Sequence, residues 1–455
     1  MRWRAYLALA GLLACGAALA QERPAPAAPP PAPAAPAGEP EAVRALRALL
    51  GPGTRLTYAA AEVIEPVRGT LRLREVALIQ PEGRATAAEL LLDGLRAEAV
   101  EEATARGVVL HGPEGEVRMD TLRLAGFSLR RPAGGEAPRP DMIRADALRV
   151  EGLTVPGETP VALATLVVED YGAGRPGRAR LEGLEIRPAE GGGLDRVSLE
   201  RLEVRGLDLA GTLTALAGQE VPPPPPGPYS LEAEGLSLGQ GGRPVGALGT
   251  LRLGGEVTAD GTESGRLALR DIRVEPFPGL DEWLRRFGYA ALLADLTAET
   301  RYERGTGRLE IGALSLAARE VGALSLSLDL EGATAEALEA QDLDAMRLRA
   351  LALRYADHSL YGRFVREQAR QTRQAEPQVR RQLAAQAAAA LAAEGEGAAL
   401  APVREAILRF LHGEAREVEF VLRPPRPLPL SELPTAAAAG PAELQRLLGL
   451  GATAR

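Results

Sequence analysis

The chain has 455 residues, of which 46% are hydrophobic and 4% aromatic, and its formal net charge is -8. This length allows two or three ordinary domains or one elongated repeat structure, and the acidic balance argues against nucleic-acid binding, which requires a basic face. The sequence contains no lysine, so P-loop, Schiff-base and Ser–Lys chemistry are excluded.

The first 20 residues have the pattern of a secretory signal peptide. Arg2 and Arg4 form a positive region, an apolar stretch follows, and Ala18-Leu19-Ala20 is a small-x-small cleavage site. We therefore expect cleavage before Gln21 and a periplasmic location for the mature protein.

Two alternatives for residues 1–20 stay open. Cys15, the only cysteine, ends the lipobox-like sequence Leu12-Leu13-Ala14-Cys15 and would carry a lipid in a lipoprotein. Alternatively, the apolar stretch remains as a short inner-membrane anchor. Residues 21–40 are almost only alanine and proline, which predicts a disordered tether because such a tract cannot bury a core.

An eight-residue pattern, apolar-x-apolar-x-[Gly, acidic or Ala]-apolar-x-apolar, recurs along the chain. Strict alternation predicts half-buried strands. The alternation slips by one residue in the middle, which predicts either a β-bulge that keeps both halves on one face or a sharp corner that separates them. The copies begin at Leu71, Leu90, Leu122, Leu148, Ala179, Leu202, Leu231, Leu267, Leu309 and Met346.

Turn signals between the copies predict a long, twisted antiparallel sheet. The expected β segments are residues 41–220 and 228–356, separated by a polyproline spacer at 221–227. We expect few helices on this sheet, so its apolar face should curl into a groove or a barrel-like shape.

Helices are expected in two places. Residues 278–294 form an amphipathic pattern with acidic residues in the first turn. Residues 357–455 are predicted as a helical C-terminal region with one strand near 417–422, and Asp357 is expected to cap its first helix. The fold class is therefore mainly β with C-terminal helices, an α+β arrangement.

Three apparent motifs are better explained by structure than by chemistry. Gly235–Gly239 matches G-x-S-x-G around Ser237, but it lies inside a strand repeat and no helix follows. Gly172–Gly177 matches G-x-G-x-x-G, but a strand follows where a dinucleotide site needs a helix, which predicts a hairpin loop. Asp357-His358-Ser359 holds triad residue types side by side, although triads converge in space and not in sequence.

No catalytic, cofactor-binding or metal-ligating residue is predicted, and no cofactor is expected. The histidines His111, His358 and His412 are scattered, and a metal site would need long-range convergence with carboxylates. We therefore expect a non-enzymatic protein, with an unrecognised carboxylate-based hydrolase as the lesser alternative.

The leader and the repeated strands resemble the AsmA and TamB-like families of proteobacterial periplasmic proteins. The stretch LRYADHSLYGRFVREQA, which begins at Leu353, resembles uncharacterised alphaproteobacterial proteins of this kind. The resemblance implies a bulged β-sheet groove and a role in lipid transport or cell-envelope maintenance. No site residues carry over.

The leading hypothesis is an apolar β-groove that binds lipid or another envelope amphiphile, with membrane association at most through the N-terminus. The alternative is a structural or protein-interaction scaffold whose apolar strand faces are self-buried. Arg149 and Glu203 are expected on the opposite, solvated face of the sheet. The residues predicted to line the groove are Leu148, Val150, Leu153, Val155, Leu202, Val204, Leu207 and Leu209.

Overall fold

The computed structural model describes residues 39–455, except for 52, 82, 114, 131–137, 190–192, 219, 221, 223–226, 278, 394–399 and 439–440. The predicted signal peptide, Cys15, nearly all of the tether and most of the polyproline spacer lie outside the described residues. The protein is mainly β, with 53% strand and 23% helix, and its antiparallel sheet is not closed into a barrel. The predicted fold class is confirmed.

The chain divides into two compact units. The first ends at Ala233 and also includes Gln240–Gly242, and the second contains Glu234–Gly239 and Arg243–Arg455. Strand β11 (Tyr229–Gln240) contributes residues to both. The boundary thus falls a few residues after the predicted spacer.

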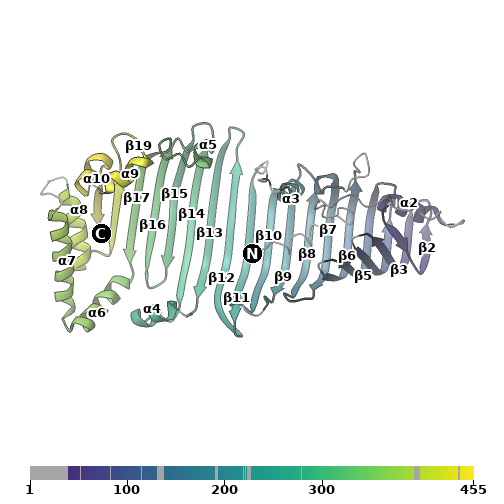
Figure 1. Cartoon of the computed structure of the whole chain (residues 1–455), viewed down its shortest axis with the longest axis horizontal. Coiled ribbons are helices and arrows are strands. Elements are labelled where there is room, and N and C mark those ends of the chain that lie inside the picture. Colours follow the sequence, from purple (N-terminus) through teal and green to yellow (C-terminus); the bar gives the residue numbers. More distant parts are fainter. Residues whose placement is uncertain are drawn as a thin grey trace. The chain divides into compact units, whose positions relative to one another are not determined.

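The first unit is an antiparallel sheet in which consecutive strands from β3 to β10 pair in chain order (Figure 1). Two short strands, β1 (Arg55–Thr57) and β2 (Ala60–Glu65), both pair with β3. Helices α2 (Glu41–Leu50) and α3 (Leu209–Ala217) and the short helix η1 (Pro140–Met142) accompany the sheet. The main strands are β3 (Thr70–Gln80), β4 (Gly83–Asp93), β5 (Ala99–Gly112), β6 (Gly115–Leu129), β7 (Ile143–Val155), β8 (Val161–Tyr171), β9 (Pro176–Ile186) and β10 (Arg196–Asp208).

The second unit continues the same pattern, with antiparallel pairing of consecutive strands from β12 to β18. Strand β20 (Gly451–Ala454) pairs with β18, and β19 (Leu428–Pro429) pairs with β17. The main strands are β12 (Arg243–Val257), β13 (Thr262–Val274), β14 (Leu292–Glu303), β15 (Arg308–Ala318), β16 (Gly322–Glu331), β17 (Arg347–Asp357) and β18 (Glu417–Leu422). The helices are α4 (Leu280–Phe287), α5 (Ala335–Glu339), α6 (Leu360–Thr372), α7 (Glu376–Ala393), α8 (Ala401–His412), η3 (Leu430–Glu432), α9 (Leu433–Ala438) and α10 (Pro441–Leu448).

Two expectations for the second unit need correction. The helix predicted at 278–294 ends at Phe287, because Gly288 adopts a left-handed conformation (φ 71°) that ends the helix, and β14 begins at Leu292. The C-terminal region contains β19 and β20 in addition to the predicted strand β18. None of the described helices combines the length and the apolarity that crossing a membrane requires.

The slip in the middle of the repeat corresponds to left-handed backbone. Where the fifth repeat position is glycine, its φ is positive, for example 65° at Gly152. Glu75 and Asp271 also adopt positive φ at this position. At Gly206 the strand pairing shifts register, as a bulge requires. At Gly152 the register is unchanged, because Glu151 pairs with Thr165 and Leu153 with Leu163. A β-bulge with a register shift, one of the two predicted alternatives, therefore occurs in only some copies.

The apolar face of the first unit forms a buried core. Leu148 (3% exposed), Val150 (1%) and Leu153 (5%) lie in one cluster with residues of β5, β6, β8 and α3. Val155 and Leu209 pack partly buried against the same cluster. The prediction that Leu148, Val150 and Leu153 line an open groove is therefore wrong, since neighbouring side chains exclude solvent from them. The remaining predicted groove residues, Leu202, Val204 and Leu207, are half-buried.

Candidate functional site

The second unit places a continuous row of apolar side chains across its strands. The row follows from strand pairing, because directly paired residues point to the same side of a sheet. The first row runs through Leu251, Leu269, Leu296, Leu316, Leu324 and Tyr355. A second row is displaced from it by two residues on each strand and runs through Leu253, Leu267, Ala298, Leu314, Leu326, Leu353 and Phe420.

Leucines in these two rows are exposed to solvent. Leu316 and Leu324 are each 45% exposed, Leu253 38% and Leu353 37%, and the leucines between them are half-buried. We call the two rows the open leucine face. From β12 to β17 it extends over about 24 Å at ordinary strand spacing. Soluble monomers seldom expose apolar patches larger than a few hundred Å² unless the patch binds something.

Helices lie along three margins of the open leucine face (Figure 1). At one end of the strands, α4 packs Leu284 and its neighbours against Leu292 and Ala318. At the other end, Leu448 of α10 clusters with Leu330 and Leu348. Beside β18, α8 packs against Phe420 and Ala452. The helices therefore frame the face and leave its middle uncovered among the described residues.

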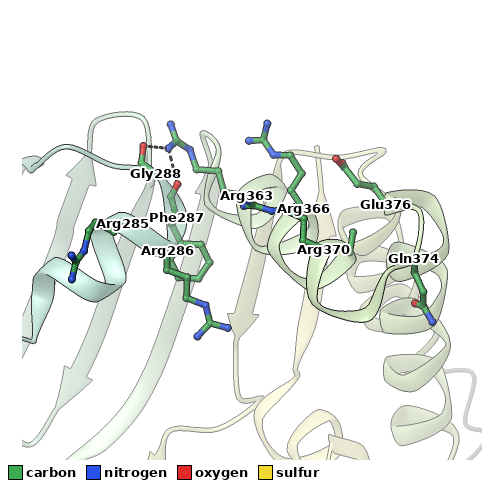
Figure 2. A pocket seen from close by; sticks show the side chains of 10 residues that line it. Arg285, Arg286, Phe287, Gly288, Arg363, Arg366, Arg370, Gln374 and Glu376 are labelled. Carbon is green, nitrogen blue, oxygen red and sulfur yellow. Dashed lines mark hydrogen bonds between the residues drawn. The ribbon is translucent and has the colours of Figure 1, made fainter.

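An arginine-lined pocket of about 730 Å³ lies at the α4 margin. Its arginines come from the last turn of α4 and from successive turns of α6, with Gln374 and Glu376 also in its lining (Figure 2). We call it the arginine pocket. Its lining arginines are Arg285, Arg286, Arg363, Arg366 and Arg370.

Arg363 holds the corner between α4 and α6 together. Its guanidinium donates hydrogen bonds to the carbonyl oxygens of Phe287 (2.7 Å) and Gly288 (2.5 Å), as Figure 2 shows. These carbonyls end α4 and have no partner within the helix. The same guanidinium lies 4.0 Å from the centre of the Tyr289 ring, a cation–π contact. Arg363 therefore has a structural role in the pocket wall.

The other pocket arginines differ in how fully their charge is neutralised. Arg285 pairs with Asp281 (2.8 Å), and Arg286 and Arg370 share Glu367 at 3.9 and 3.0 Å. Arg366 is exposed, and no carboxylate among the described residues pairs with it. The pocket therefore keeps a net positive charge, in contrast to the acidic chain as a whole.

The residues of the apparent triad have structural partners. Asp357 accepts a hydrogen bond from the Tyr361 backbone N–H (2.7 Å), which caps the first turn of α6 as predicted, although Ser359 is the residue next to the helix. Asp357 also accepts from the Tyr355 hydroxyl (3.0 Å). Burial and then the Asp357 charge raise the pKa of Tyr355. His358 is exposed, so the three side chains form no relay.

The other sequence motifs lie where their strand context predicts. Ser237 is inside β11, and Gly172–Gly177 spans the turn between β8 and β9 and the start of β9. His111 pairs with Glu116 at 3.2 Å. Within the described residues, no group of three or more metal-ligating side chains converges.

A family model described only as "Uncharacterized protein" matches residues 315–455. This part includes the end of β15 and all of β16 to β20 together with α6, α7, α8 and α10. No curated protein and no solved structure matches the chain.

The predicted repeat copies correspond to alternate strands of the open leucine face, β13, β15 and β17, and they do not predict its exposure. Leu316 and Leu353 belong to predicted repeat copies, whereas Leu324 lies in an alternating run that was not counted among them. Exposure depends on which helices cover a face, and strand alternation carries no information on that. The arginines of α6 had a usable signal, since Arg363, Arg366 and Arg370 follow the spacing of one helix face.

Proposed function

We propose that the protein binds an amphiphile on the open leucine face of its second unit and acts by binding, without catalysing a reaction. The observation that carries this proposal is the exposure of Leu316 and Leu324, paired on adjacent strands in the middle of the apolar rows. Covering apolar surface stabilises a complex by about 25 cal/mol per Å². An acyl chain laid along these rows would gain this energy.

The helical margins favour a small amphiphile over a second sheet. A flat partner sheet would need strands to pass over α4, α8 and α10, which pack at the margins of the apolar rows. Acyl chains are narrow and flexible, so they fit a framed surface. The signal-peptide pattern of residues 1–20 supports a role in the cell envelope, in lipid transport or envelope maintenance.

The test is photo-crosslinking of the full chain to a diacylglycerol with a diazirine on its acyl chain, delivered in phosphatidylcholine vesicles. We expect crosslinks on β14 to β17. Leu324→Asp should reduce the yield at least about tenfold, because a carboxylate on the face costs more than 1.4 kcal/mol when an acyl chain covers it.

Ser325→Asp is the matched control. It adds the same charge at the next residue of β16, on the opposite face, where Ser325 pairs across strands with Arg354. This variant should crosslink like the wild type. Absence of crosslinking in the wild type, or equal loss in both variants while both keep their circular dichroism, would refute the proposal.

A further inference from the structure

We infer that the arginine pocket binds the anionic, phosphate-type head group of the amphiphile whose acyl chains lie on the open leucine face. This inference rests on the proposed function and assigns the head-group class, which the apolar face alone does not determine. It follows from the position of the pocket, from its unneutralised charge and from the geometry of arginine.

The pocket lies directly at the end of the open leucine face. Helix α4 packs on Leu292 and Ala318, the residues that follow the exposed leucines toward the end of the strands. Arg363 pairs at 3.6 Å with Glu320 in the turn that joins β15 to β16. These two strands carry Leu316 and Leu324. A molecule with its chains on the leucines would therefore reach the pocket with its head.

The charge of the pocket selects an anion. Carboxylates pair with Arg285, Arg286, Arg363 and Arg370. Arg366 is left with its full charge and faces solvent in the same lining. Guanidinium groups match phosphate oxygens by paired, charge-assisted hydrogen bonds. An uncharged head group would accept only weaker hydrogen bonds from these donors and would leave the charge of Arg366 uncompensated.

The side chains in the pocket are not all equivalent for a test. Arg363 supports the end of α4 through two carbonyls and the Tyr289 ring, so replacing it would disturb the fold. Arg366 has no such role among the described residues. Arg404 on α8 is likewise exposed but lies outside the pocket lining, which makes it a matched control for surface charge.

The experiment compares diazirine-labelled phosphatidic acid with diazirine-labelled diacylglycerol of the same acyl chains, on the intact protein in phosphatidylcholine vesicles. The wild type should reach half-maximal crosslinking at about tenfold lower phosphatidic acid than diacylglycerol, the value of one charge-assisted hydrogen bond. Arg366→Glu should remove this preference and leave diacylglycerol crosslinking unchanged. Arg366→Gln should remove most of it, and Arg404→Glu should keep it.

Each of the following outcomes would overturn the inference. If the wild type crosslinks both lipids equally, or Arg366→Glu behaves like Arg404→Glu, the inference is overturned and the proposed function stands. If neither lipid crosslinks, the proposed function fails as well. If inorganic phosphate alone shifts the melting temperature as much as phosphatidic acid does, and Arg366→Glu abolishes both shifts, the pocket is a free-phosphate site and the lipid assignment is wrong.

Discussion

Glu203 shows how a single residue on the polar face of a sheet can become part of the core. It was expected to be solvated, yet it is 2% exposed. Its carboxylate accepts hydrogen bonds from Arg178 (2.6 Å), Arg205 (2.7 Å) and Arg201. The guanidinium groups of these arginines surround the carboxylate, while the arginine side chains themselves remain partly exposed. The expectation that the Glu203 side chain is solvated is therefore wrong.

Glu203→Gln should lower the free energy of unfolding by about 1–3 kcal/mol, because an amide accepts weaker hydrogen bonds and leaves the arginine charges uncompensated. Glu151→Gln is the control, since Glu151 has one partner, Arg149, on a half-exposed site, and should change stability by less than about 0.5 kcal/mol. Urea unfolding at pH 7 measures both. Equal small effects would show that the arginine cluster adds nothing.

The same site predicts a pH dependence. Burial alone would raise the pKa of Glu203, but the hydrogen bonds from the three arginines lower it from 4.5 to about 2. A carboxylate with a lowered pKa in the folded state stabilises the protein above its unfolded pKa, and this stabilisation is lost as the pH falls toward the folded pKa. The stability difference between wild type and Glu203→Gln should therefore be constant above about pH 5 and shrink between pH 4.5 and 2.

At the scale of the strand, the repeat was predictable because its alternation is local. The sequence located the slip at the fifth position, and left-handed backbone is found there at Gly152 and Gly206. Whether the slip shifts the register of strand pairing was less predictable. The alternation of the neighbouring strand can slip at the opposite residue and so preserve the register, as in β8 opposite Gly152. Register depends on two strands together, and a single repeat copy does not contain both.

Gly152→Val should destabilise the protein by roughly 1–3 kcal/mol, because the φ of 65° strains a β-branched residue. A Cβ would also collide with the Asp120 carboxylate. Gly112→Val in β5 is the control, since Gly112 has no positive φ and nothing lies within 4 Å of its Cβ position. Thermal unfolding by circular dichroism distinguishes them, and equal melting temperatures would refute the strain argument.

At the scale of the molecule, one repeat pattern has two outcomes. In the first unit, α2 and α3 contribute to buried clusters with the sheet, and Leu90 and Phe127 pack against both clusters. In the second unit, the helices pack at the margins of the apolar rows and the central leucines remain exposed. The sequence pattern predicted an apolar face in all ten copies, although the named candidate residues all lie in the first unit, because the copies in the two units look alike. Coverage of the apolar face by helices distinguishes the first unit from the second.

The two outcomes predict opposite responses to the same change. Val150 is 1% exposed, so Val150→Asp would bury a carboxylate without a partner and should cost about 3–5 kcal/mol. Leu324 is 45% exposed, so the carboxylate of Leu324→Asp stays hydrated in the free protein and should cost less than about 1.5 kcal/mol. Urea unfolding followed by circular dichroism compares the variants in the absence of lipid. If Leu324→Asp unfolds as readily as Val150→Asp, then Leu324 is core, and the open leucine face is not a free binding surface.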